Sequence, residues 1–153
     1  MSGHHPLSAT AASLADAFDR ALERHTVAPW FPRVVPEDLP HDGFHQDFDE
    51  AWRPAGPRPR SVVYQSRVVW TAATLARRRP WIGPGATVFR RWAARGLDAL
   101  VRRFSTGEPG GVCFWEDRPH ESHLYAVSFA LFAASAAVRL PAAPPAPSPR
   151  PPP

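Results

Sequence analysis

Apolar residues recur at helical spacing in four segments of the chain. From Ser8 to His25 and from Phe89 to Phe104 they form one stripe opposite charged residues, which is typical of a helix with one buried face. Residues 61–79 and 124–138 are instead apolar on almost every face, as in a helix that is surrounded by other helices. Ser8 is expected to cap the first helix. The pattern predicts an all-α fold with helices in the order outer, inner, outer, inner.

Prolines and glycines mark the connections between these segments. The prolines that follow His25 are expected to end the first helix, because proline lacks the backbone N–H that a helix requires: they are Pro29, Pro32, Pro36 and Pro40. Two short runs, residues 42–49 and 112–116, follow or contain glycines and each precede an inner helix. Their alternating or apolar character predicts short β-hairpin loops.

The two inner segments form an internal repeat. Residues 64–73 align with residues 125–134, so that Tyr64 matches Tyr125. An amphipathic helix paired repeatedly with an all-apolar helix suits a closed double ring, in which each inner helix has neighbours on every side. The sequence therefore predicts part of an α/α toroid, with about four helices in two outer/inner hairpins.

Six short motifs occur in order between about Trp30 and Ala137. They are Trp30-Phe31-Pro32-Arg33, Gly43-Phe44 with Asp47 to Asp49, Tyr64-Gln65-Ser66-Arg67-Val68-Val69-Trp70, Gly96-Leu97-Asp98 with Phe104, Gly110-Gly111 with Phe114-Trp115, and Leu124-Tyr125 with Ser128-Phe129-Ala130-Leu131. In order and spacing this set resembles the N-acylglucosamine 2-epimerase family, which includes cellobiose 2-epimerases and mannose isomerases. The resemblance implies an (α/α)6 barrel that isomerises a free mono- or disaccharide, with histidines as acid and base.

The resemblance also implies that only part of the barrel is present. The family's barrel has twelve helices, and the histidines that transfer its proton lie on later hairpins. Residues 8–140 are therefore expected to be the N-terminal part of a sugar epimerase or isomerase domain, inactive alone. Residues 141–153 hold eight of the 20 prolines and are expected to be a disordered tail.

Three residues are candidates for sugar binding, and none is a candidate catalytic residue. Arg67 matches the position where the family binds sugar hydroxyls; the alternative is a structural ion pair with Asp47, Asp49 or Glu50. Tyr125 matches a family tyrosine that faces the cleft, and Tyr64 could offer an aromatic face, although both residue types also serve packing. Among the histidines only His45 is worth attention, and a surface role is the simpler interpretation.

Composition narrows the remaining function classes. The net charge is +4, but all 18 basic residues are arginine, which points to codon bias rather than nucleic-acid binding. No segment reaches the length of a membrane span, no motif indicates a cofactor or metal, and the lone Cys113 suggests a reducing cytoplasmic setting. Two alternatives stay open: a fragment of a six-hairpin glycosidase, and a helical scaffold with a proline-rich tail. Apolar faces that other hairpins would cover are expected to be exposed and to favour self-association.

Overall fold

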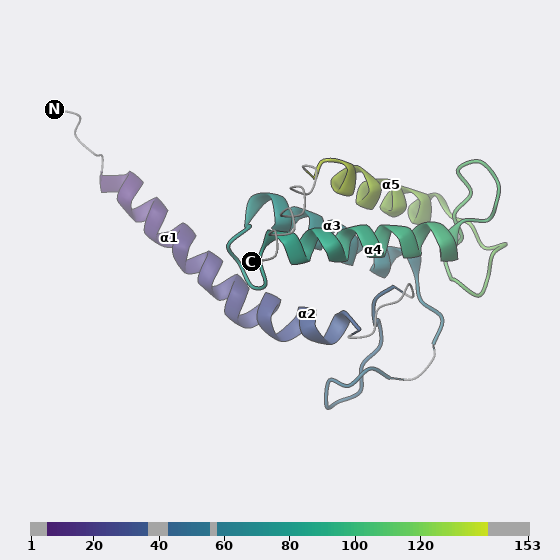
Figure 1. The fold of residues 1–153 in the computed structure, drawn as a ribbon, viewed down its shortest axis with the longest axis horizontal. Helices are drawn as coiled ribbons and strands as arrows, with labels where there is room; N and C mark the ends of the chain where they lie inside the picture. The colour runs from purple at the N-terminus through teal and green to yellow at the C-terminus, as the bar shows by residue number, and fades with distance from the viewer. Residues whose placement is uncertain (1–5, 37–42, 56–57, 141–153) are drawn as a thin grey trace, which may run out of the picture.

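A computed structural model describes residues 6–36, 43–55 and 58–140 of the chain. The helices are α1 (Pro6–Leu22), α2 (Ala28–Val34), α3 (Val62–Arg78), α4 (Ala86–Phe104) and α5 (Leu124–Val138), and a π-helical turn at Glu23–Val27 joins α1 to α2. Helix α1, the π-helical turn and α2 make one continuous helical run, and its α1 part extends well beyond the rest of the molecule (Figure 1). The all-α prediction is confirmed for the described residues.

Helices α3, α4 and α5 form the body of the molecule. Helix α3 packs against both α4 and α5, and α4 also contacts α5. One end of this body is tied by backbone hydrogen bonds: the Val62 N–H donates to the Phe114 carbonyl, and the Cys113 N–H donates to the Phe104 carbonyl, each at 2.9 Å. The start of α3 therefore lies beside the end of α4 and the loop that leads into α5 (Figure 1).

The inner segments form the helices that their sequences predict. Helix α5 has the expected limits, and α3 ends one residue short of Arg79. The start of α3 is fixed by Ser61, whose hydroxyl accepts a hydrogen bond from the Tyr64 N–H at 3.3 Å. This N-cap satisfies one of the free donors of the first turn.

The expected break after His25 is wrong. Pro29 and Pro32 lie inside the helical run, which begins at Pro6 rather than after Ser8. The Ala28 N–H donates to the carbonyl of Glu23, five residues earlier, so the chain is already in a wider turn when it reaches Pro29. A π turn of this kind accommodates a residue that cannot complete the ordinary hydrogen-bond ladder.

The two predicted β-hairpin loops are also wrong as far as the structure describes them. Residues 43–55 hold one isolated bridge, between Phe48 and Pro54. In the second loop Ser105 forms a single bridge with Val112, and Trp115 forms one with Ser61 at the start of α3. Alternation over so few residues does not extend a ladder beyond one pair. Residue 42 and the proline-rich segment 141–153 lie outside the described residues.

The burial of α1 and α5 differs from what the sequence predicts for an outer helix with one buried face and an inner helix surrounded by others. The apolar stripe of α1 is exposed, and α1 packs against none of α3, α4 and α5. Helix α5, expected to be surrounded, buries only Ala126 and Ala133 fully and leaves Leu131 65% exposed. The apolar exposure expected for an inner helix without its neighbours is therefore observed on α5.

The lone cysteine lies at the end of the body where backbone hydrogen bonds join the start of α3, the end of α4 and the loop before α5, named here the closed end. Cys113 is 1% exposed, directly between the end of α4 and the loop before α5. Burial is the main cause that raises the pKa of its thiol, and the negative charges of Glu116 and Asp117 act in the same direction. The thiolate is therefore disfavoured at this position.

Candidate functional site

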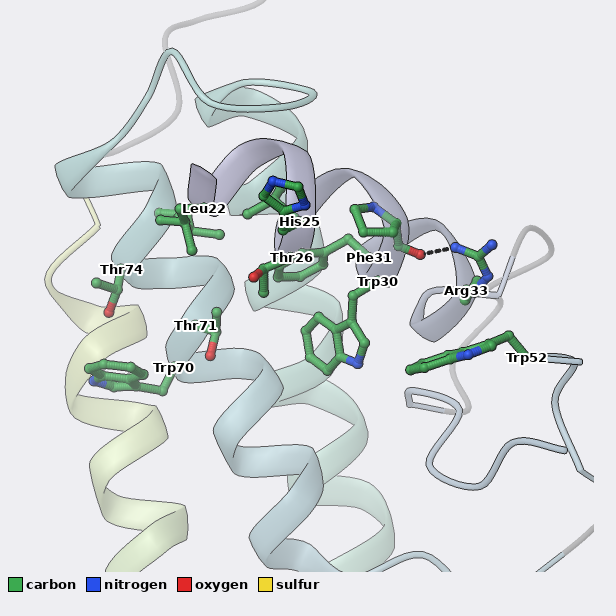
Figure 2. Close-up of a pocket in the computed structure, with 13 residues that line it drawn as sticks. Leu22, His25, Thr26, Trp30, Phe31, Arg33, Trp52, Trp70, Thr71 and Thr74 are labelled. Atoms are coloured by element: carbon green, nitrogen blue, oxygen red, sulfur yellow. Dashed lines mark hydrogen bonds between the residues drawn. The ribbon is translucent and has the colours of Figure 1, made fainter. Parts of the chain in front are cut away.

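An open pocket of about 710 Å³ lies between the α1–α2 run and α3 (Figure 2). Three of the six tryptophans of the chain line it: Trp30 from α2, Trp70 from α3, and Trp52 from the loop between them. The other described lining residues include one histidine, one arginine and three threonines, and none of them is a carboxylate. The pocket thus combines aromatic faces with hydroxyl groups, in a space large enough for a small molecule.

Helix α3 presents its less buried face to this pocket. Trp70, Thr71 and Thr74 line it, whereas the valines and alanines on the other side of α3 pack in the core. The indole of Trp70 stacks on Phe132 of α5, with ring centroids 5.2 Å apart and planes 19° apart. The Trp70 side chain, which forms one wall of the pocket, is thus held by contacts with both α3 and α5.

The π turn supplies the opposite wall. His25 and Thr26 belong to the turn Glu23–Val27 and point toward the pocket (Figure 2). Phe31 anchors the following helix because its ring packs on Phe89 and Trp92, at 5.2 Å from each. The sequence pattern did not mark His25 and Thr26 as pocket residues; their one signal is Pro29, which closely follows them in an otherwise helical pattern.

Trp52 is held at the pocket by a tight turn with an unusual backbone. It is the only non-glycine residue with a positive φ in the described part of the chain, at 60°. The Asp49 carboxylate accepts hydrogen bonds from the N–H groups of Ala51 and Arg53, each at 2.9 Å, and pairs with the Arg53 side chain. These bonds hold the pKa of Asp49 below its ordinary value. The turn therefore offsets the strain of presenting a bulky, half-exposed side chain.

Arg67 is not among the residues that line the pocket; it lies on α3 one turn before Thr71, which does line it. The Thr71 hydroxyl donates to the Arg67 carbonyl at 2.8 Å, which follows from this spacing. The Arg67 side chain is exposed to solvent. No ion pair joins it to Asp47, Asp49 or Glu50 among the described residues, and Asp49 pairs with Arg53 instead.

The two candidate tyrosines do not line the pocket. Tyr125 is 57% exposed near the start of α5, where its ring meets the edge of Phe129 at 4.9 Å. Tyr64 has a buried hydroxyl with no hydrogen-bond partner in the described part of the chain. Burial, together with the negative charge of Asp47, raises the pKa of Tyr64 to about 12. The structure thus separates Tyr64 and Tyr125 from the three pocket tryptophans.

His45 lines a smaller cavity of about 350 Å³ on another side of the loop region. Burial and the nearby Arg60 cation lower its pKa, so the imidazole is neutral at physiological pH. Arg60 is paired with Glu116 at 3.1 Å. No cluster of three or more metal-binding side chains occurs in the part of the chain that the structure describes.

Replacing Tyr64 with phenylalanine is expected to leave stability unchanged within about 1 kcal/mol, or to raise it slightly. The hydroxyl has no hydrogen-bond partner among residues 6–36, 43–55 and 58–140, so its removal deletes only a desolvation cost. Urea denaturation measures the change. Ser61→Ala is the reference, because loss of that N-cap should cost about 1 kcal/mol. A loss for Tyr64→Phe clearly above that of Ser61→Ala would contradict this prediction.

None of the helices among the described residues combines the length and apolarity that a bilayer crossing requires. The chain matches no model of a known protein family.

Proposed function

We propose that this chain binds a free mono- or disaccharide in the pocket between the α1–α2 run and α3, as part of a sugar epimerase or isomerase of the N-acylglucosamine 2-epimerase family. The observation that carries the proposal is the convergence of Trp30, Trp52 and Trp70 with threonine hydroxyls, one helical turn from Arg67. A sugar ring has an apolar face that suits an indole and hydroxyls that suit polar side chains.

Arg67 is the proposed polar anchor of the site. Its guanidinium carries five N–H donors and no acceptor, so it matches the oxygen-rich edge of a sugar. The side chain is exposed and free of any carboxylate partner among the described residues, so the sugar need not displace an existing ion pair. The partial (α/α)6 toroid belongs to the same proposal, supported by the order of α3, α4 and α5 and by the motif resemblance.

Binding without turnover is the activity that this pocket supports. Moving a proton at a sugar carbon needs an acid and a base placed at that carbon. Among the described residues that line the pocket, His25 is the one histidine and none is a carboxylate, so no such pair is placed there. A glycosidase needs a pair of carboxylates at its cleft, and the described lining of this pocket supplies none, so the epimerase proposal is preferred to the glycosidase alternative. The scaffold alternative depends on segment 141–153, outside the described residues.

Titration of the full chain with mannose, N-acetylmannosamine and cellobiose tests the proposal. Tryptophan fluorescence should change on binding, because three indoles line the pocket. Arg67→Ala is expected to raise Kd about 10- to 100-fold, the usual effect of losing hydrogen bonds from a charged group. Incubation of each sugar with the protein, followed by chromatography, should show no isomeric product.

The matched control is Arg91→Ala, which removes an exposed arginine from α4, away from the pocket. It should bind sugar like the unaltered chain. Absence of binding by the unaltered chain, or equal affinity of the Arg67→Ala and Arg91→Ala variants, would reject the proposal. Turnover would reject the non-catalytic assignment and would direct attention first to His25.

A further inference from the structure

Helix α5 presents an apolar surface that no other described segment of the chain covers. Its residues, Leu124–Val138, include no charged side chain. Leu131 is 65% exposed, Phe132 46% and Val138 81%. Large apolar side chains exposed along one uncharged helix are a feature of interaction surfaces.

This surface includes a groove along the line where α5 meets α4, named here the α4–α5 groove. It has a volume of about 370 Å³, and residues of both helices line it: Leu97, Leu100, Val101, Val127, Ala130, Leu131 and Ala134. Val101 and Leu131 are each more than 60% exposed and belong to opposite sides of the groove. Such a groove suits the apolar side of an amphipathic helix.

The chain carries a helix with the matching pattern. Leu14, Phe18 and Leu22, named here the α1 stripe, recur every four residues and are exposed, Phe18 by 67%. Charged residues such as Asp16 and Arg20 occupy the other side of α1. A spacing of i, i+4 and i+8 gives the anchors with which a helix binds an apolar groove.

The α1 stripe and the α4–α5 groove cannot meet within one copy. Helix α1 continues through the π turn into α2 without a break, and the buried Phe31 and Val34 fix that run in the core. The Asp19 carboxylate also pairs with Arg79 at 2.7 Å, and Glu23 accepts a hydrogen bond from the Gly83 N–H at 3.0 Å. Helix α1 is consequently held pointing away from the body (Figure 1).

We infer that a second copy of this chain covers both surfaces, with α1 of each copy lying in the α4–α5 groove of the other. The 17 residues of α1 span about 25 Å and the 15 residues of α5 about 22 Å, so the two elements match in length. Reciprocal exchange is self-complementary and closes as a two-fold dimer. A second copy supplies both a helix for the groove and a groove for the helix, so one kind of contact, made twice, covers both surfaces.

Two variants disrupt one side of the contact each. Phe18→Glu places a charge in the α1 stripe, and Leu131→Glu places one in the α4–α5 groove; both positions are exposed within one copy, so the fold should persist. Sedimentation equilibrium of the full chain should give a dimer, and each variant should raise the dimer Kd about 100-fold or more. Arg20→Glu adds the same residue on the opposite side of α1 and should remain dimeric.

Mixing the two variants gives the decisive result. The Leu131→Glu copy retains its α1 stripe and the Phe18→Glu copy retains its groove, so a mixed dimer has one intact contact of the two. Native mass spectrometry should detect this heterodimer at concentrations where each variant alone is monomeric. A monomeric parent chain, open-ended oligomers, a dimer that Phe18→Glu does not weaken, or failure of the mixture to associate would each overturn the inference.

Discussion

The Gly96→Val variant is expected to lose about 3 kcal/mol or more of its free energy of unfolding. A Cβ atom on Gly96 would lie 2.5 Å from Cε2 of Phe44 and 2.6 Å from Cγ2 of Val69. Both neighbours are fully buried, so neither can move aside without disturbing the core. Gly96 thus allows α4 to approach α3 and the loop that carries Phe44. Urea denaturation followed by circular dichroism measures the loss.

The control for this variant is Ala94→Val. Ala94 is an exposed position of the same helix, so the change costs only the lower helix propensity of valine, about 0.5 kcal/mol. The difference between the two variants isolates the steric term. If Gly96→Val were no less stable than Ala94→Val, the close packing of α4 against Phe44 and α3 would be refuted.

Gln65→Leu is expected to lower the free energy of unfolding by about 2–4 kcal/mol. The Gln65 side chain accepts a hydrogen bond from the Phe44 N–H at 2.7 Å and donates one to the Phe44 carbonyl at 2.9 Å. Leucine has a similar volume but leaves both backbone groups of Phe44 without a partner in a buried setting. The loop that precedes α3 would keep the bond from the His45 N–H to the Val34 carbonyl and the bond from the Ser61 N–H to the Gln46 side chain, but would lose both bonds between Phe44 and Gln65.

Ser66→Ala provides the comparison at the adjacent position. The Ser66 hydroxyl is buried and has no hydrogen-bond partner among the described residues, so its removal should change stability by less than about 1 kcal/mol. Thermal unfolding of the two variants, recorded together, separates a satisfied buried polar group from an unsatisfied one. Equal losses would show that the paired hydrogen bonds of Gln65 do not hold the loop.

The sequence predicted helices most accurately where local signals agree. Helices α3 and α5 have strong apolar patterns and clear limits: Ser61 caps the first, and turn-forming residues precede the second. Proline at position 29 gave the wrong limit because its effect depends on the turn before it, and a π turn leaves no regular pattern. The stripe of α1 correctly indicated an amphipathic helix, but periodicity does not specify what covers the apolar side.

None of the three residues proposed from the sequence lines the pocket, although Arg67 lies one helical turn from the lining residue Thr71. Helical periodicity places Arg67, Trp70 and Thr71 on one face of α3, but nothing local places Trp52 there, because a tertiary turn brings that residue to the pocket. Neighbouring positions of one motif also have different roles: Gln65 is buried and binds backbone, whereas Arg67 is exposed. The two residues differ in burial, and burial depends on how the helices pack, which the local sequence does not specify.

The position of Cys113 makes the closed end of the body accessible to kinetic measurement. A thiol reagent reaches a buried, protonated thiol only when the surrounding structure opens, and this is the single cysteine of the chain. At low reagent concentration the labelling rate therefore equals the opening equilibrium constant times the rate of an exposed thiol. The ratio of the two rates gives the free energy of local opening where α3 begins and α4 ends, without any substitution or added probe.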